Sequence, residues 1–164
     1  MANKPRTLGQ LKKAGYQVLP IREELRNNLI AKIQNDEDIF PGIEGYEQTV
    51  VPQLQNAILS GQDIILLGER GQAKSRIIRS LTSLFDEWTP VIDGVELPEN
   101  PFEPISPQGR ALVNELGNRT PIRWMHRDER YGEKLATPDI TIADLIGEVD
   151  PIKVAEGLYL SDEL

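Results

Sequence analysis

The sequence predicts an α/β fold in which helices surround a mainly parallel sheet, and three neighbouring segments favour it. Residues 63–67 read Asp-Ile-Ile-Leu-Leu, an apolar run without alternation, as expected for a strand buried on both faces. A glycine-containing loop follows at residues 68–73, and Lys74 then opens a helix. The apolar face of that helix consists of Ile77, Ile78, Leu81, Leu84 and Phe85. A strand, a glycine loop and a helix in this order form the repeating unit of parallel sheets.

Two helices are predicted ahead of this unit. Apolar residues spaced four apart indicate a helix from about Ile21, namely Ile21, Leu25, Leu29 and Ile33. A second helix carries Val50, Val51, Leu54, Ala57 and Ile58, and Ser60 and Gly61 form a plausible stop. Pro52 must lie in the first turn of that helix or kink it, because proline cannot donate the helical hydrogen bond.

Closely spaced prolines predict a long irregular insertion at residues 89–107. They are Pro90, Pro98, Pro101, Pro104 and Pro107. Insertions of this length in a small domain are usually functional or poorly ordered. Ser106 and Pro107 resemble an N-cap followed by a first-turn proline, and Gly117 is placed to end the resulting short helix.

The remaining elements are shorter. Residues 122–125 predict a second strand, and Thr141 is placed to cap a short helix through Ile146. Asp150 and Pro151 repeat the cap-plus-proline pattern. The chain contains no internal repeat and no low-complexity tract.

Composition excludes several classes of protein. The 164 residues are 39% hydrophobic and 27% charged, which is typical of one globular domain. There is no cysteine, so disulfide and thiolate chemistry are excluded, and the single His126 excludes a histidine-rich metal site. No apolar run approaches the roughly 18 residues of a membrane helix. The first residues, MANKPRTLGQ, lack the apolar segment of a secretory signal. We therefore expect a cytoplasmic protein without a membrane span.

Charge is distributed unevenly along the chain. The net charge is −8, which argues against broad nucleic-acid binding. Residues 1–35 nevertheless contain seven Lys or Arg and two Asp or Glu and are therefore net positive. The other 24 Asp or Glu and 11 Lys or Arg lie in residues 36–164, which are strongly negative. We interpret residues 1–35 as a lead-in and an amphipathic helix with a solvated basic face. The alternative is a basic arm that docks on an acidic or anionic partner.

The loop carries the chemistry that the sequence predicts. Residues 68–75 read Gly-Glu-Arg-Gly-Gln-Ala-Lys-Ser and match G-x-x-x-x-G-K-[ST] at every fixed position except Ala73. In this motif the loop N–H groups and the helix N-terminus surround phosphates. Lys74 would reach the β- and γ-phosphates, and the Ser75 hydroxyl would ligate Mg²⁺. Alanine at position 73 is tolerable if its backbone is already near helical values.

These residues resemble a known family. Ala-Lys-Ser in place of Gly-Lys-Ser is frequent in MoxR-type and magnesium-chelatase-like AAA+ ATPases. Residues 40–46, Phe-Pro-Gly-Ile-Glu-Gly-Tyr, are similar to the family's segment ahead of its first core helix, where the adenine ring is held. Residues 144–151, Asp-Leu-Ile-Gly-Glu-Val-Asp-Pro, are similar to its segment before an inserted hairpin. The resemblance covers roughly residue 39 to the C-terminus and implies a phosphate-loop (P-loop) NTPase core.

The family couples ATP hydrolysis to remodelling of a partner protein, and in magnesium chelatase it drives metal insertion into a porphyrin. Its members assemble as hexameric rings with ATP at subunit interfaces. The resemblance implies nucleotide binding by Gly68, Glu69, Arg70, Gly71, Gln72, Ala73, Lys74 and Ser75, with Mg²⁺ on Ser75 and Lys74 as the catalytic residue. It implies an adenine pocket formed by Phe40, Pro41, Gly42 and Ile43.

Other parts that the family's chemistry needs have no counterpart in the sequence. AAA+ hydrolysis requires a Walker B strand, an apolar run that ends in an acidic pair. Residues 91–93 are too short for one, and residues 142–144 lie in a helical pattern. The sensors, the arginine finger and the helical lid are also missing. We therefore expect the N-terminal portion of a longer ATPase, which binds nucleotide weakly and turns it over negligibly by itself.

Two other functions are open. One is a non-catalytic interaction module whose remnant loop binds nucleotide or nothing, while its basic arm docks on a full-length ATPase. The other is a small nucleotide kinase, which requires an acceptor site that the charged residues 123–130 supply only faintly. His126, in the same segment, fits a structural histidine better than a general base. The acidic residues between 86 and 103 lack metal-ligand spacing, and we expect them to be solvated.

Overall fold

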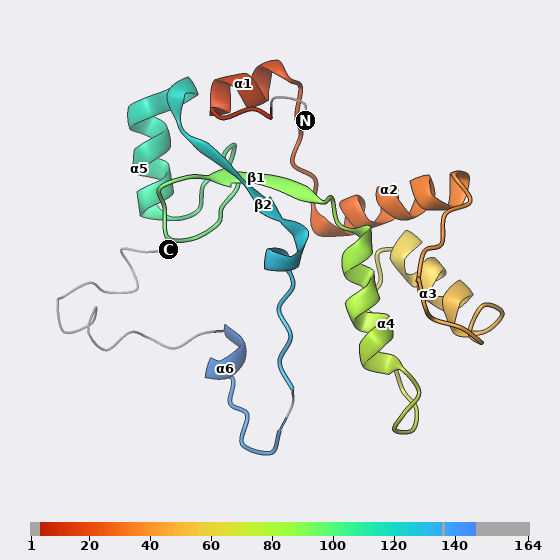
Figure 1. Ribbon diagram of the computed structural model, residues 1–164. Helices are drawn as coiled ribbons and strands as arrows, with labels where there is room; N and C mark the ends of the chain where they lie inside the picture. The colour runs from red at the N-terminus through yellow and green to blue at the C-terminus, as the bar shows by residue number, and fades with distance from the viewer. Residues whose placement is uncertain (1–3, 136, 147–164) are drawn as a thin grey trace. The chain divides into compact units, whose positions relative to one another are not determined.

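The computed structural model describes residues 4–135 and 137–146 (Figure 1). Its α-helices are α1 (Leu8–Lys13), α2 (Ile21–Gln34), α3 (Val50–Leu59), α4 (Lys74–Ser80), α5 (Pro107–Leu116) and α6 (Ala143–Ile146). Short 3-10 helices follow at η1 (Leu81–Leu84), η2 (Gly117–Arg119) and η3 (Arg127–Arg130). The strands are β1 (Trp88–Ile92) and β2 (Ile122–His126).

The chain divides into two compact units. The helical unit comprises residues 17–89 and 126–128, and it holds the predicted phosphate loop. The sheet unit takes the described residues within 1–16, 90–125 and 129–164.

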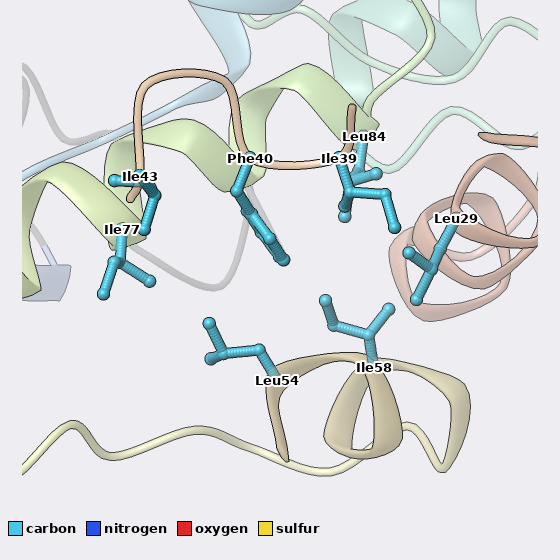
Figure 2. Close-up of a cluster of buried hydrophobic side chains, with 8 residues drawn as sticks. All are labelled: Leu29, Ile39, Phe40, Ile43, Leu54, Ile58, Ile77 and Leu84. Carbon is cyan, nitrogen blue, oxygen red and sulfur yellow. The ribbon is translucent and has the colours of Figure 1, made fainter. Parts of the chain in front are cut away.

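The core of the helical unit forms where three helices meet the turn before α3. Figure 2 shows its side chains pointing toward one another from α2, α3, the helical segment after the loop, and the turn at residues 39–43. The buried members are Leu29, Ile39, Phe40, Ile43, Leu54, Ile58, Ile77 and Leu84. Burying such side chains is the main favourable contribution to folding. The predicted adenine-binding turn is therefore built into this core.

Helix α2 begins where predicted, but only the two middle residues of its predicted apolar face, Leu25 and Leu29, pack into the core. Ile21 and Ile33 are 56% and 46% exposed, whereas Glu24 and Leu29 are buried. The Glu24 carboxylate accepts a hydrogen bond from the Asp86 N–H at 2.7 Å. The amide of Asn28 donates to the Leu84 carbonyl at 2.9 Å. Helix α2 is thus held by polar contacts to the end of η1 and the residues just after it, in addition to the burial of Leu29.

The predicted parallel P-loop sheet is wrong. The protein is mainly helical, and within the described ranges its sheet has only two strands, β1 and β2. Hydrogen bonds from the Arg127 N–H to the Glu87 carbonyl and from the Asp93 N–H to the Pro121 carbonyl flank the pair and show that it is antiparallel.

The predicted strand at residues 63–67 is an irregular segment. Ile64 and Leu66 pack partly against the core, but Ile65 and Leu67 are 83% and 89% exposed. No backbone hydrogen bond joins Ile64–Leu67 to another part of the chain that the structure describes. A strand buried on both faces needs hydrogen-bonded neighbours on both sides, and β1 and β2 pair with each other instead.

The proline-rich segment contains more order than the sequence predicts. Strand β1 overlaps the start of the predicted insertion, and its Pro90 is fully buried. A two-stranded sheet consists of edge strands only, so the missing N–H of a proline is tolerated there. Helix α5 confirms the predicted cap, because the Ser106 hydroxyl accepts from the Gly109 N–H and Pro107 occupies the first turn.

Other predicted elements are confirmed. Helix α3 carries Pro52 in its first turn, Gly117 follows α5 with a positive φ of 52°, and β2 starts at Ile122. Helix α6 forms in the predicted region, but Thr141 lies two residues before it and its hydroxyl donates to the Asp144 carboxylate, so the predicted Thr141 cap is not confirmed. The pattern at Asp150 and Pro151 lies outside the described residues.

Helix α1, in the sheet unit, was not predicted from the sequence. Its Leu8 and Leu11 are buried, and the Thr7 hydroxyl accepts from the Gln10 N–H as an N-cap. The Leu8 N–H donates to the Thr120 carbonyl at 3.0 Å, and the Ile122 N–H donates to the Arg6 carbonyl at 2.9 Å. These bonds attach residues 6–8 to the chain that leads into β2.

Candidate functional site

The predicted phosphate loop is a compact turn that ends at the first residue of α4. Gly68 and Gly71 adopt positive φ angles of 153° and 83°, and Ala73 follows at 53°. Positive φ is readily accessible only to glycine, so the two glycines are required by the path of the chain. The order of loop and helix is therefore as predicted, although the strand before them is absent.

Ala73 corrects one expectation about the motif. We expected alanine there to be tolerable in a helical backbone, but its φ and ψ of 53° and 14° are left-handed. For a residue with a Cβ this conformation costs roughly 1–2 kcal/mol. Ala73 occupies the position at which the motif has its second glycine, and the backbone shows why glycine suits it.

Lys74 folds back over the loop. Its ammonium donates hydrogen bonds to the carbonyls of Gly68, at 2.8 Å, and Glu69. The positive charge is thus held at the loop rather than extended into solvent. A lysine in this place can offset the charge of a phosphate bound to the loop amides.

Gln72 closes the other side of the loop. Its side-chain oxygen lies so close to Gly68 that a Cβ at position 68 would collide with it. The Gln72 carbonyl accepts a hydrogen bond from the Tyr46 hydroxyl at 3.3 Å. That bond connects the loop to the turn in which the adenine pocket was predicted.

The turn and the loop share one cavity. It measures about 360 Å³ and is lined by Gly42, Ile43, Glu44, Tyr46, Ala73 and Arg76. Of the four residues predicted to hold adenine, Gly42 and Ile43 line it, whereas Phe40 is buried in the core and Pro41 is exposed. Two predicted regions about 30 residues apart in sequence therefore meet.

Tyr46 and Arg76 are cavity residues to which the sequence assigned no individual role. Arg76 lies two residues after Lys74, so its place in the first turns of the helix was the only signal available. One Nη atom of Arg76 lies 2.5 Å from the point where Gly42 would carry a Cβ. Gly42 has a φ of +75°, so glycine serves there both for the turn and for the approach of the guanidinium.

A local carboxylate stabilises the same turn. Glu47 accepts a hydrogen bond from the Gly45 N–H at 2.9 Å. The backbone N–H groups of Glu47 itself and of Gly45 lower the pKa of the Glu47 carboxyl below its ordinary value. The carboxylate therefore stays ionised at neutral pH, at the end of the segment that lines the cavity.

The remaining loop residues are open to solvent. Glu69, Arg70, Gly71, Gln72 and Ser75 are all exposed. Ser75 in the first turn of α4 supplies one oxygen suited to Mg²⁺, an ion commonly bound by few protein oxygens together with nucleotide phosphates and water. Within residues 4–135 and 137–146, no group of three or more His, Asp or Glu side chains is arranged to hold a metal. The Ser75 hydroxyl is thus suited to a magnesium ion only as one ligand beside those that a nucleotide would supply.

His126 has structural partners. Its ring packs edge-on against Trp88 with centroids 5.0 Å apart, and Nδ1 lies 3.1 Å from Asp128. Neither His126 nor Trp88 lines the cavity at the loop. The arrangement is that of a packed histidine at the end of β2, which agrees with the structural interpretation rather than with a general base.

Glu99 is a buried carboxylate that the sequence did not identify, since the acidic residues between 86 and 103 were expected to be solvated. It accepts hydrogen bonds from the N–H groups of Ile105, at 2.7 Å, and Ser106, at 2.8 Å, and from the Ser106 hydroxyl. A Cβ at Gly109 would collide with the Glu99 carboxylate. Glu99 therefore organises the proline-rich segment and the start of α5.

No helix in the described part of the chain combines the length and the apolar character needed to cross a bilayer. We found no match to this chain among known protein families, curated proteins or solved structures.

Proposed function

We propose that this chain binds MgATP through residues 68–75 and supplies the nucleotide-binding part of a magnesium-chelatase-like AAA+ ATPase. In the proposed assembly, a hexameric ring couples ATP hydrolysis to remodelling of a separate partner protein, with metal insertion as one possible output. One observation carries the proposal. Ala73 of the loop lies far in sequence from Gly42 and Ile43 of the predicted adenine site, yet all three line a single cavity.

The proposed binding chemistry is positioning and electrostatics. Loop amides donate to the phosphates, and Lys74 supplies a point charge that already lies against the carbonyls of Gly68 and Glu69. Ser75 offers its hydroxyl to Mg²⁺, which offsets phosphate charge when it is bound with the nucleotide. These groups bind and orient the nucleotide in the ground state.

Hydrolysis needs additional groups. An acidic residue must orient water and complete the metal shell. The sequence after residue 75 offers no apolar run that ends in an acidic pair for that purpose. We therefore assign turnover to the assembled ATPase and expect negligible turnover by this chain alone.

Calorimetric titration with MgATP tests the proposal. Lys74→Ala should weaken binding by about 10- to 100-fold, because a hydrogen bond to a charged group contributes roughly 1.5–3 kcal/mol. Lys13→Ala, at an exposed position in α1, removes the same charge elsewhere and should leave the affinity unchanged. Phosphate release is followed in parallel. Robust ATP turnover by the isolated chain would contradict the proposal. An affinity for MgATP that is unchanged in Lys74→Ala would contradict it as well.

The second candidate is a non-catalytic module that docks on a full-length ATPase. It is favoured by Ile65 and Leu67, which expose apolar side chains directly before the loop. Light scattering separates the two functions. The ATPase proposal expects nucleotide-dependent hexamers, and the module expects a stoichiometric complex with another protein whether or not nucleotide is present.

A further inference from the structure

We infer that the sheet unit carries a binding site for a small phosphate monoester. The site is a cavity of about 520 Å³ that is lined by Lys4, Pro5, Arg6, Gln10 and Ala14. All five residues belong to the sheet unit, whereas the loop at residues 68–75 belongs to the helical unit. The inference is therefore independent of the proposed function.

Several hydrogen-bond acceptors of the cavity lining are already engaged within the protein. The Pro5 carbonyl accepts from the indole N–H of Trp124 at 2.8 Å, and the Arg6 carbonyl accepts from the Ile122 N–H at 2.9 Å. The side-chain oxygen of Gln10 accepts from the Arg6 N–H at 2.8 Å. A ligand in the cavity therefore meets a lining in which donors, rather than these acceptors, remain available.

Arg6 and Gln10 supply the available donors. Because the Arg6 N–H can only donate, the oxygen of the Gln10 amide faces it, and the NH2 group of that amide is left to donate elsewhere. The Arg6 guanidinium has neither a hydrogen bond nor an ion pair with any residue that the structure describes. A guanidinium presents its N–H groups in a planar fork that matches the oxygens of phosphate and carboxylate groups.

Lys4 adds a second positive charge whose position is restrained. Its ammonium lies 5.3 Å from the centroid of the Trp124 ring. Trp124 is fixed in turn by its N–H bond to the Pro5 carbonyl and by the edge-on packing of Tyr16, with ring centroids 5.9 Å apart. An aromatic ring attracts a cation but carries no compensating charge. The described residues that line the cavity thus include two cations and no acid.

The number and charge of these donors favour a phosphate monoester over a carboxylate. A phosphate monoester carries a charge of about −1.5 to −2 at neutral pH and has three strong acceptor oxygens. Lys4, Arg6 and Gln10 supply two positive charges and one neutral donor, so each oxygen can have its own partner. The volume lies within the range of small-molecule sites and leaves room for an organic group beside Pro5 and Ala14.

Calorimetric titration with glycerol 3-phosphate tests the inference. The titrations use Lys74→Ala protein without magnesium, so that binding at residues 68–75, the other proposed phosphate site, is suppressed. Arg6→Ala should weaken binding by about 10- to 100-fold, because it removes charge-assisted hydrogen bonds. The matched control is Arg119→Ala, at an exposed position of the same unit outside the cavity, and it should leave the affinity unchanged. Circular dichroism checks that each variant is folded.

Gln10→Glu is a second variant that keeps the internal hydrogen bond. A glutamate oxygen can still accept from the Arg6 N–H, but the free donor is replaced by a negative charge that repels phosphate. Binding of glycerol 3-phosphate should therefore be lost. Full affinity in either Arg6→Ala or Gln10→Glu would place the ligand elsewhere on the chain and overturn the inference. Failure of glycerol 3-phosphate to bind at millimolar concentration would overturn it as well.

Three further ligands test the chemical class. Succinate should bind more weakly than glycerol 3-phosphate, because each of its carboxylates has two oxygens and a single charge. Inorganic phosphate should also bind more weakly, because it leaves the rest of the cavity empty. Equal affinity for either of them would reduce the cavity to a general anion site and overturn the inference. A phosphoserine peptide that binds more tightly than glycerol 3-phosphate would assign the site to a protein partner and would likewise overturn it.

Discussion

Ala73 shows how a single residue can carry strain next to a proposed binding site. Its left-handed backbone lets the chain turn from the loop into α4, and the alanine Cβ makes that conformation unfavourable. The strain is local, because the N–H of Ile77 still donates to the Ala73 carbonyl at 2.9 Å and the helix begins normally. Relief of the strain should therefore be measurable without disruption of the fold.

We expect Ala73→Gly to raise the free energy of unfolding by about 0.5–1 kcal/mol. Glycine removes the roughly 1–2 kcal/mol cost of the left-handed conformation. Part of that gain is offset because glycine also increases the conformational entropy of the unfolded chain. Urea unfolding measures the change. Ala57→Gly, inside α3, is the control and should lower stability by about 1 kcal/mol, since its backbone is helical. Equal losses from both substitutions would show that Ala73 is not strained.

Helix α5 shows how an element can depend on a contact from outside it. Ser106 caps the helix by a local rule, and Glu99 then fixes the cap by accepting from the Ser106 hydroxyl and N–H. Gly109 leaves room for the carboxylate, although glycine in a helix is otherwise unfavourable. The helix is thus fastened to the proline-rich segment at its first turn.

The ionisation of Glu99 should make stability depend on pH. Burial raises the pKa of this carboxyl, but hydrogen bonds from Ser106 and Ile105 and the positive charge of Arg110 lower it more, so the folded pKa lies below the ordinary 4.5. The stabilisation is therefore complete above pH 4.5 and is lost as the pH falls from there through the folded pKa.

Glu99→Gln should lower the free energy of unfolding by about 2 kcal/mol at pH 7, because it removes hydrogen bonds to a buried charge. It should also reduce the loss of stability below pH 4.5, the ordinary pKa of the group. Urea unfolding at several pH values measures both effects. The matched control is Glu103→Gln, at an exposed position in the same segment, which should change stability by less than about 0.5 kcal/mol. An unchanged pH profile in Glu99→Gln would remove Glu99 from this role.

At the scale of the whole molecule, the basic residues that are close together in the sequence belong to two different units. The basic excess of residues 1–35 is split, with Lys12 and Lys13 in the sheet unit and Arg22 and Arg26 in the helical unit. Arg22 also pairs with Asp63 at 3.0 Å in an exposed ion pair. The positive charge therefore does not form one continuous arm within a single unit.

The correction of the fold class can be tested with a pair of leucines. Leu67→Ser should change the free energy of unfolding by less than about 0.5 kcal/mol, because Leu67 is 89% exposed. Leu54→Ala should cost about 2–5 kcal/mol, because Leu54 is buried in the core of the helical unit. Urea unfolding of both variants gives the comparison. A cost for Leu67→Ser as large as that of a core truncation would instead support a buried strand at residues 63–67.

By itself the sequence determined the features that depend on near neighbours in the chain. The caps of α5 at Ser106 and Gly117, the starts of α2 and α4, and strand β2 all follow from residues within a few positions of each other. The loop motif belongs to the same class, because its glycines and Lys74 act on one short stretch of backbone.

Only the tertiary structure decided what depends on distant partners. An apolar run such as Ile64–Leu67 becomes a buried strand only when other strands donate hydrogen bonds to it, and periodicity within the run carries no information about them. The burial of Glu99 and the placing of Arg76 against Gly42 likewise join residues 6 to 34 positions apart. Packing depends on contacts between residues that are distant in the sequence. Composition and spacing therefore predicted the loop but not the cavity beside it.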